Sequence, residues 1–296
     1  MDVLLPLLNP TKTFGMQAEF EKAEAVVLPV PYDATASYLK GTRLGPAAII
    51  DASSQLEEYD IELGMNICEK VPVCTLGELN VEGKKPEEMV KLVSEAVKAI
   101  VKQGKKPVVL GGEHSLTAGA VEALRDVSVL QIDAHTDLRD SYEGSRYSHA
   151  CTMRRVREIS DNVVQVGIRS MCDEEADYIR KEGLEKSIFY AKDFDKDKIK
   201  EIVSQLKKDV YVTVDVDGFD PSVMPGTGTP EPGGLSWYDV VSLMEALGKE
   251  KKVVGFDIVE VIPVPPLHIT EFTAAKLAYK MIGYFWGRLI YDSLKR

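Results

Sequence analysis

The chain is poor in cysteine: its 296 residues include four, at Cys68, Cys74, Cys151 and Cys172. They form neither a C-x-x-C pair nor a zinc-finger spacing, which argues against a structural zinc site and a disulfide framework. With 45% hydrophobic residues, a chain of this length can bury a large core without cross-links. We therefore expect reduced thiols and a core held together by packing.

The sequence also lacks long apolar runs and clusters of positive charge. No stretch approaches the roughly 18 apolar residues that a membrane-spanning helix needs, and residues 1–14 do not resemble a signal peptide. Asp and Glu (47) outnumber Lys and Arg (36), and the formal net charge of −11 argues against a nucleic-acid partner. These absences predict a cytoplasmic protein, and the acidic balance favours a cationic substrate through long-range attraction.

Short β-branched runs alternate with longer helical patterns, without a repeat or a convincing linker. The predicted strands are 25–30, 106–110, 127–132, 163–168, 187–190, 209–214 and 252–258. The predicted helices are 46–50, 86–102, 115–124, 150–159, 174–181, 196–207, 236–247 and 269–294. Several strands are apolar at nearly every position, which is typical of strands covered on both faces. The alternation predicts an α/β fold with a mostly parallel sheet and helices on both sides, in one domain spanning 1–296.

Side chains that can bind metal follow four of the predicted strands. The clusters are G-G-E-H-S at 111–115, D-A-H-T-D at 133–137, D-V-D-G-F-D-P at 215–221 and D-I-V-E at 257–260. In open α/β sheets, ligands bind outside the carboxyl ends of the strands, so we expect these clusters to meet in one crevice. Asp133, His135 and Asp137 alternate at period two, as do Asp215 and Asp217, and an extended backbone would point each group to one side.

Grouped carboxylates repel one another and are costly to bury unless a cation balances them. Oxygen donors with some imidazole and no thiolate favour Mn²⁺, with Fe²⁺, Co²⁺ or Zn²⁺ as substitutes. We interpret the pattern as a binuclear metal centre that supplies hydroxide for hydrolysis near neutral pH. Asp137 is expected to bind metal and to accept a hydrogen bond from the hydroxide, and His149 to carry a proton to a leaving amine. His268 is expected to have no role in the site.

The three longest motifs, followed by G-T-G-T-P-E-P-G-G at 226–234, resemble in order and composition those of the ureohydrolase (arginase/agmatinase) family, from about Pro31 to the final helix. The resemblance implies a three-layer α/β/α fold and two Mn²⁺ ions per chain. It also implies a homo-oligomer, either a trimer or a hexamer. The ligands implied for one ion are His114, Asp133, Asp137 and Asp215, and those for the other are Asp133, His135, Asp215 and Asp217.

Two further residues match functional positions of the family. His149 matches its proton-shuttling histidine. Glu260 matches the carboxylate that binds the substrate guanidinium, and a planar pair of oxygens does suit a planar fork of N–H donors.

Within the family, the loop sequences resemble agmatinase more than arginase. Cys172 stands where arginases have a carboxylate that recognises the α-amino acid group of arginine. The predicted reaction is therefore the hydrolysis of agmatine to putrescine and urea, with either His149 or Asp137 protonating the leaving amine. N1-aminopropylagmatine, guanidinobutyrate and arginine remain open as alternative substrates. The candidates for binding the distal ammonium of agmatine are Glu143, Asp173, Glu174 and Glu175.

Two rival functions lie outside this reaction. An arginase-fold amine deacetylase would use essentially one zinc ion, and His114 and Asp137 argue against it. A non-catalytic interaction protein would not need every metal ligand, and the complete set argues against that function.

Overall fold

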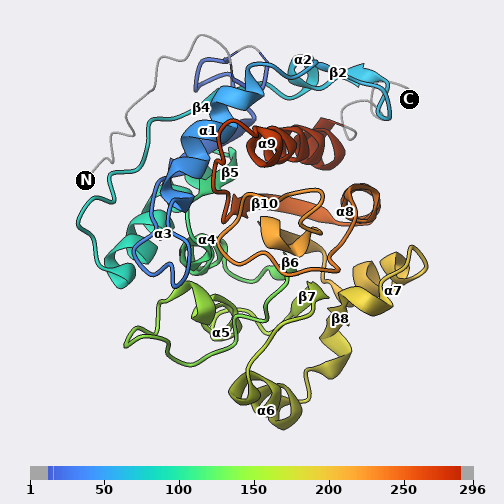
Figure 1. Ribbon diagram of the computed structural model, residues 1–296. Coiled ribbons are helices and arrows are strands. Elements are labelled where there is room, and N and C mark those ends of the chain that lie inside the picture. Colours follow the sequence, from blue (N-terminus) through green and yellow to red (C-terminus); the bar gives the residue numbers. More distant parts are fainter. Residues whose placement is uncertain (1–12, 16, 288–296) are drawn as a thin grey trace.

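Eight parallel strands form one sheet in the computed structural model, which describes residues 13–15 and 17–287 (Figure 1). Their order is β4-β1-β5-β10-β9-β6-β7-β8. The strands are β1 (Ala25–Val30), β4 (Val73–Thr75), β5 (Lys106–Gly111), β6 (Ser128–Ile132), β7 (Val163–Ile168), β8 (Ile188–Tyr190), β9 (Asp209–Asp215) and β10 (Lys252–Val259). A separate antiparallel hairpin consists of β2 (Tyr59–Asp60) and β3 (Met65–Asn66).

Helices cover both faces of the sheet, so the predicted three-layer α/β/α architecture is confirmed (Figure 1). One layer contains α1 (Gly45–Ser53), α2 (Ile67–Lys70), α7 (Lys198–Gln205), α8 (Trp237–Glu250) and α9 (Ile269–Ile282). The other contains α3 (Pro86–Lys102), α4 (Thr117–Leu124), α5 (Thr152–Arg157) and α6 (Asp173–Glu182). Each layer packs its own apolar cluster against the sheet. None of the helices in the described ranges is long and apolar enough to cross a membrane.

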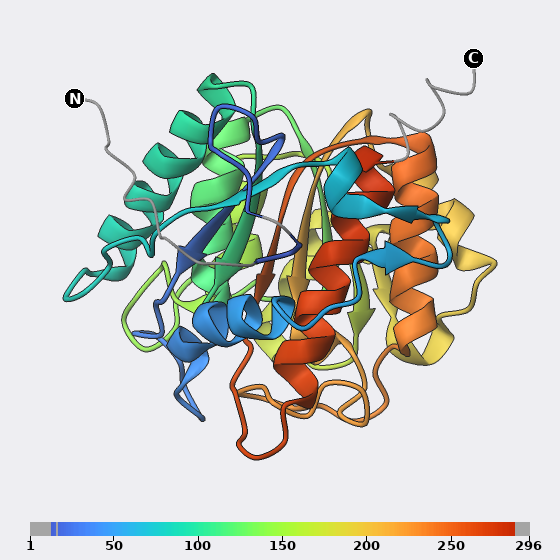
Figure 2. The same ribbon diagram turned by 90° about the horizontal axis from the view of Figure 1, so that it is seen from above.

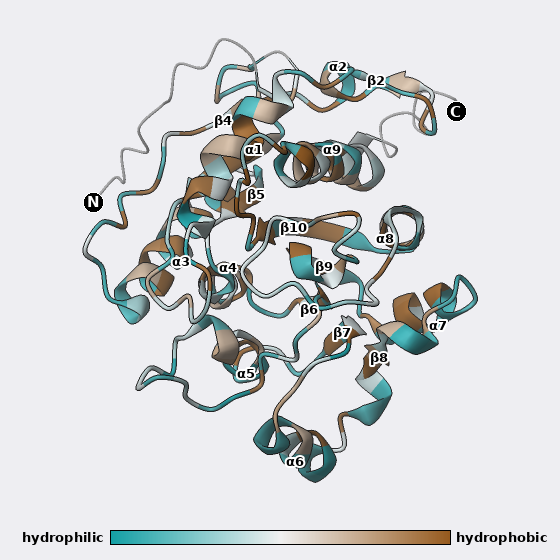
Figure 3. Ribbon diagram, viewed as in Figure 1, coloured by the Kyte–Doolittle hydropathy of each residue, from teal (hydrophilic) through white to brown (hydrophobic). Residues whose placement is uncertain are grey.

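Local sequence signals explain where several elements begin and end. Pro86 opens α3, where its missing N–H costs nothing, and Glu88 accepts a hydrogen bond from the backbone N–H of Lys85 at 2.9 Å. Gly183 ends α6 in the left-handed conformation, with φ at 67°. The central strands are buried along nearly their whole length, as the apolar runs predicted. Figure 3 shows β10 in brown between helices that are partly teal.

The shortest elements were not predicted from the sequence, and several helix ends were placed two or three residues away, such as those of α1, α5 and α8. β4 has three residues and the hairpin strands two each, too few for a period of two to be recognised. The helix predicted at 269–294 ends as α9 at Ile282 and continues as a π-helical turn, Gly283–Gly287. Residues 288–294 of that prediction lie outside the described part of the chain. One domain over 1–296 stays a prediction.

The strand order gathers the polar clusters at one edge of the sheet. β6 is the next strand after β5 along the chain. In the sheet, however, β10 and β9 lie between β5 and β6. The loops after β5, β10, β9 and β6 therefore leave four neighbouring strands at their carboxyl ends. Figure 2 shows the arrowheads pointing to this edge, with the orange loops that follow β9 and β10 gathered beyond it. A crevice forms where consecutive strands separate in this way.

Candidate metal centre

His114 is surrounded by three carboxylates, two from the loop after β6 and one from the end of β9. Its Nδ1 lies 3.2 Å from Asp133 Oδ2, 3.1 Å from Asp137 Oδ2 and 3.5 Å from Asp215 Oδ2. All four side chains are buried. The imidazole comes from a 3-10 turn directly after β5, and two of the three aspartates come from the loop after β6. The structure thus brings together the first four predicted ligands.

His135 forms a second cluster that shares Asp133 with the first. Its Nδ1 lies 3.0 Å from Asp217 Oδ2 and 3.6 Å from Asp133 Oδ1. In the two triads, His114–Asp133–Asp215 and Asp133–His135–Asp217, the possible ligand atoms lie within 4.8 Å of one another. Two adjoining buried His/Asp triads with a common carboxylate fit a binuclear metal site.

Turns, and not extended backbone, bring these side chains together. Asp217 lies in a 3-10 turn, and its N–H donates to Asp215 Oδ1 at 3.0 Å. Asp137 has a left-handed backbone, with φ at 52°. The expectation that period-two spacing in extended strands aligns the ligands is therefore wrong, although the predicted convergence is correct. Short polar side chains favour such turns because they bond to nearby backbone N–H groups.

The charges of the two clusters are those of a cation site. Burial, followed by the negative charge of Asp133, raises the pKa of Asp137 to about 7. Burial alone would lower the pKa of His135, but the carboxylates of Asp133 and Asp217 outweigh it and raise this pKa to about 12. Over the described ranges, no Lys or Arg forms an ion pair with these aspartates. Buried carboxylates grouped in this way need a cation to balance their charge, and the residues present fit two divalent cations.

Glu260 and His149 lie beside the clusters. Glu260 Oε1 accepts a hydrogen bond from the backbone N–H of His114 at 2.7 Å and lies 3.8 Å from His149 Nδ1. Its backbone is left-handed, with φ at 64°. Burial lowers the pKa of His149 to about 4, and its Nε2 is buried without a hydrogen-bond partner in the described structure. Both side chains line the same cavity.

Glu113, the carboxylate of G-G-E-H-S, holds the loop that supports His149. It accepts hydrogen bonds from the N–H and the hydroxyl of Thr35, each at 2.6 Å, and from the hydroxyl of Ser115 at 2.6 Å. Thr35 Oγ1 in turn accepts from the N–H of His149 at 3.0 Å. The sequence analysis did not assign a role to Glu113 or Thr35.

A cavity of about 260 Å³ opens over the clusters and contains most of the predicted site residues. It is lined by Ser37, His135, Asp137, Arg139, Tyr142, His149, Ala150, Ser170, Met171, Cys172, Glu175, Asp215, Asp217, Thr229 and Glu260. The buried ligands His114 and Asp133 lie beneath it and do not line it. Sequence reasoning missed Ser37, Arg139 and Tyr142, because loop residues carry no periodic signal. His268 pairs with Glu271 at 2.7 Å and does not line the cavity, as expected.

The Gly/Pro-rich stretch after β9 reaches the site. Thr229 donates to Asp217 Oδ2 at 3.2 Å, and Glu231 Oε1 lies 3.9 Å from His135 Nε2. Arg169 fixes this stretch against the ligand turn. Its guanidinium donates to the carbonyls of Asp217 at 2.6 Å and Glu231 at 2.7 Å, and also to those of Gly218, Phe219 and Pro232.

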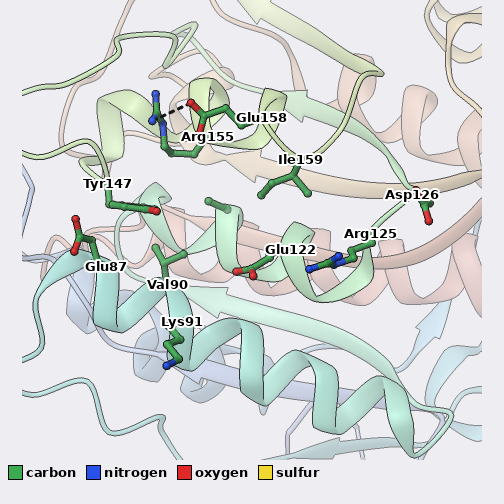
Figure 4. A pocket seen from close by; sticks show the side chains of 11 residues that line it. Glu87, Val90, Lys91, Glu122, Arg125, Asp126, Tyr147, Arg155, Glu158 and Ile159 are labelled. Atoms are coloured by element: carbon green, nitrogen blue, oxygen red, sulfur yellow. Dashed lines mark ion pairs between the residues drawn. The ribbon is translucent and has the colours of Figure 1, made fainter.

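A larger cavity, of about 720 Å³, lies away from this chemistry between α3, α4 and α5 (Figure 4). Its wall mixes acids and bases such as Glu87, Lys91 and Glu122, and Arg155 pairs there with Glu158 at 3.1 Å. It contains no histidine and no metal-binding triad. Size therefore does not identify the functional site here, whereas the convergence of ligand-type side chains does.

Comparison with known proteins gives the class of protein to which this fold and site belong. The family model described as "Arginase family" matches residues 23–283, and the chain belongs to that family. It is 42% identical over 280 residues to the N(1)-aminopropylagmatine ureohydrolase of Synechocystis, covering 90% of each chain. It is 39% identical to the agmatinase of Pyrococcus horikoshii, covering 94% of this chain and 98% of the relative.

A solved structure agrees with these relatives. The agmatine ureohydrolase of Thermoplasma volcanium superposes with a TM-score of 0.85 at 37% identity, over 93% of this chain and 94% of that chain. Within the family, the protein is therefore an agmatinase-like ureohydrolase. A guanidino compound is the class of substrate that this membership implies.

Proposed function

We propose that the protein hydrolyses agmatine to putrescine and urea with two Mn²⁺ ions bound. The observation that carries the proposal is Glu260: a buried carboxylate that faces an open cavity beside two His/Asp triads. In the described structure its nearest ion-pair partner is His149, at 3.8 Å. A buried carboxylate is costly unless a cation pairs with it, and a guanidinium presents N–H groups in the matching planar arrangement.

The ligand assignment follows the two clusters. His114, Asp133, Asp137 and Asp215 would hold one ion, and Asp133, His135, Asp215 and Asp217 the other. Asp133 would bridge, because one of its oxygens faces His114 and the other faces His135. Asp215 is the second bridge in the proposal. The absence of thiolate and the majority of carboxylate oxygens support manganese.

Each remaining residue has a chemical task. When bound, the two ions would lower the pKa of water and so supply hydroxide near neutral pH. Glu260 binds the guanidinium and presents its carbon to the centre. Asp137 accepts a hydrogen bond that orients the nucleophile. His149 is uncharged near neutral pH because burial lowers its pKa, so it carries a proton from the reacting water to the leaving amine as the C–N bond breaks, and water and agmatine give urea and putrescine.

The cavity also supports a choice among the acidic residues considered for the distal ammonium. Glu175 lines it, whereas Glu143, Asp173 and Glu174 do not. The Glu175 carboxylate accepts from the Thr136 hydroxyl and from the N–H groups of Leu138 and Cys172, at 2.7 to 2.8 Å. Among residues 13–15 and 17–287, no Lys or Arg forms an ion pair with Glu175, so its negative charge would attract an ammonium.

Recognition of an α-amino acid group receives less support. Cys172 lines the cavity where an arginine substrate would need a carboxylate. Arg139 also lines the cavity, with its guanidinium 4.8 Å from the centre of the Tyr142 ring. The positive charge of Arg139 would repel an ammonium from the side of the cavity that Arg139 lines. We therefore expect the distal ammonium of the substrate to lie toward Glu175.

N1-aminopropylagmatine is the second candidate substrate, because the Synechocystis relative is named for it. Urea release from manganese-loaded protein with agmatine, N1-aminopropylagmatine, guanidinobutyrate and arginine separates the candidates by kcat/KM. We expect agmatine to be turned over best. Preference for the aminopropyl compound would move the proposal to that substrate, and preference for arginine would overturn it. Turnover of acetylated amines with a single zinc ion would indicate a deacetylase instead.

The ligand assignment is tested by Asp217→Ala, with Asp209→Ala as the matched control. Asp209 starts the strand that Asp215 ends, at the opposite edge of the sheet. We expect Asp217→Ala to lower the manganese content and abolish urea release while the circular dichroism spectrum stays unchanged. Asp209→Ala should retain both properties. Full activity and metal content in Asp217→Ala would contradict the assignment.

A further inference from the structure

Beneath the metal centre, four buried polar side chains form a row across the sheet. Gln131 on β6 is the register partner of Gln165 on β7 and of Thr213 on β9, and Thr213 is the register partner of Asp257 on β10. All four are completely buried. Neighbouring strands in register place their side chains on the same face, so the row lies on one face of four consecutive strands.

Such a row is unexpected in the centre of this fold. The strands around it are otherwise almost wholly apolar, and a polar side chain in such a place destabilises the protein unless its hydrogen bonds are satisfied. In β6 and β9 the polar residue lies two positions before a predicted metal ligand, Asp133 or Asp215. Side chains two positions apart on a strand share a face, so the row lies directly under the ligands.

One half of the row determines which nitrogen of His114 faces the carboxylates. The hydroxyl of Thr213 donates to Asp257 Oδ1 at 2.6 Å, and Thr213 Oγ1 lies 2.8 Å from His114 Nε2. A threonine hydroxyl has a single proton, and here that proton points to Asp257. Thr213 therefore accepts from His114 Nε2, and Nδ1 is the ring nitrogen that faces the carboxylates and is left to bind an ion.

Asp257 holds the proton of the Thr213 hydroxyl, so that Thr213 can only accept from His114 Nε2. Its other oxygen, Oδ2, accepts from the hydroxyls of Tyr211 at 2.8 Å and Thr117 at 2.9 Å. Three hydroxyl donors thus surround the carboxylate, and among the described residues no Lys or Arg pairs with it. An ionised Asp257 has only acceptors, so Thr213 cannot reverse its hydrogen bond while this carboxylate is charged.

The other half of the row orients Asp133. The amide of Gln165 donates to Gln131 Oε1 at 2.5 Å and to the carbonyl of Thr136 at 2.8 Å. With its oxygen occupied in this way, Gln131 turns its NH₂ group toward Asp133 Oδ2, at 2.5 Å. Asp133 Oδ1 accepts from the N–H of His135 at 2.6 Å. These bonds fix both oxygens of the carboxylate that faces the two histidines.

We propose that the row Gln165–Gln131–Thr213–Asp257 positions the ligands of the metal centre: Thr213 and Asp257 orient His114, and Gln131 and Gln165 orient Asp133. The inference rests on the ligand roles proposed above. It assigns positioning roles, since none of the four residues lines the cavity. Loss of such a supporting hydrogen bond typically weakens metal binding about 10- to 100-fold.

The test compares Thr213→Val, which removes the hydroxyl and keeps the shape, with Thr213→Ser, which keeps the hydroxyl. Manganese binding to metal-free protein is measured by equilibrium dialysis, together with the urea midpoint of unfolding. In Thr213→Val we expect one ion to bind about 10- to 100-fold more weakly and the other ion to be nearly unaffected. Thr213→Ser should bind both ions as the wild type does.

Two further variants separate positioning from loss of stability. Gln131→Met removes support from Asp133, which faces both histidines, and should weaken both ions. Asp257→Asn keeps the volume but allows an amide N–H to compete for Thr213, and should weaken the same single ion as Thr213→Val. A general loss of stability would weaken both ions in every variant. It would not weaken a single ion in Thr213→Val and Asp257→Asn and both ions in Gln131→Met.

The outcomes distinguish the two proposals. If the wild type binds two ions and Thr213→Val binds both with unchanged affinity, the positioning role of the row is overturned. The proposed function would remain intact. Equal weakening in Thr213→Val and Thr213→Ser, in step with their unfolding midpoints, would also overturn it. Wild-type protein that binds no pair of ions would overturn the proposed function, and the row with it.

Discussion

Glu260 and Asp137 share a backbone conformation that side chains other than glycine rarely adopt. Their φ angles are 64° and 52°, and a left-handed residue of this kind costs about 1–2 kcal/mol. Each turns its carboxylate into the cavity at the point where a loop leaves the ligand cluster. Gly112 supports the turn at Glu260, because the Gly112 carbonyl accepts the Glu260 N–H at 2.7 Å. Gly112 also packs so closely on the chain that a Cβ at this position would lie 2.0 Å from the Tyr32 carbonyl oxygen.

Glu260→Gln should impair substrate binding more than metal binding. The amide oxygen can still accept the N–H of His114, but the negative charge that would pair with a guanidinium is lost. Losing a charge-assisted hydrogen bond costs about 1.5–3 kcal/mol, so we expect kcat/KM to fall about 10- to 150-fold. Urea-release kinetics and manganese content check this. A fall in manganese content matching the fall in activity would contradict the role of Glu260.

At the level of elements, strands and their ends were easier to predict than the loops between them. The runs at 25–30, 163–168 and 209–214 were predicted correctly, because burial on both faces leaves an unbroken apolar signal. Thr229 reaches the site because its loop directly follows the strand that ends at Asp215. Ser37 and Tyr142 could not be predicted, since their positions depend on loops packed by contacts such as Thr35 with Glu113.

The polar row was present in the sequence but not recognised. Gln131 and Thr213 each interrupt an apolar strand two positions before an aspartate. The importance of that spacing becomes clear only when the strand register is known, because Gln131 and Thr213 lie 82 residues apart and meet through pairing of β6 with β9.

Arg169 connects two loops, and its loss should loosen both. In Arg169→Met, the carbonyls of Asp217 and Glu231 lose a charged donor, although water can reach part of this surface. We expect the free energy of unfolding to fall by about 2 kcal/mol and manganese binding to weaken, because Asp217 belongs to the same turn. Urea titration and equilibrium dialysis measure the two effects. The control Arg180→Met, on the exposed surface of α6, should change stability by less than about 0.5 kcal/mol.

In the whole molecule, a buried ion pair fastens the β2–β3 hairpin to α9. Lys280 Nζ lies 2.7 Å from Asp60 Oδ2 and 3.0 Å from Glu62 Oε2. Burial alone would raise the pKa of Asp60, but the hydrogen bond from Lys280 and those from the N–H groups of Leu63 and Glu62 outweigh it, and the pKa is lowered. Folding therefore favours the ionised carboxylate.

The stability supplied by Asp60 should depend on pH. A carboxyl group whose pKa is lowered by folding contributes fully above its unfolded pKa of about 3.9, and the contribution is lost as the pH falls through the folded pKa. We expect Asp60→Asn to cost about 3 kcal/mol at pH 7 and progressively less below about pH 4. Urea titrations of both metal-free proteins from pH 7 to pH 3 measure this difference. A constant difference down to pH 3 would contradict it.

The overall topology has a consequence for biosynthesis. β10 is made last among the strands of the large sheet, yet it is inserted between β5 and β9. While the ribosome is still translating residues before 252, β5 and β9 each present an open edge that can recruit a foreign strand. The nascent chain also lacks Asp257 and Glu260 at that stage. The candidate site can be completed only when translation has nearly finished, and the edges of β5 and β9 stay open to pairing with other chains until then.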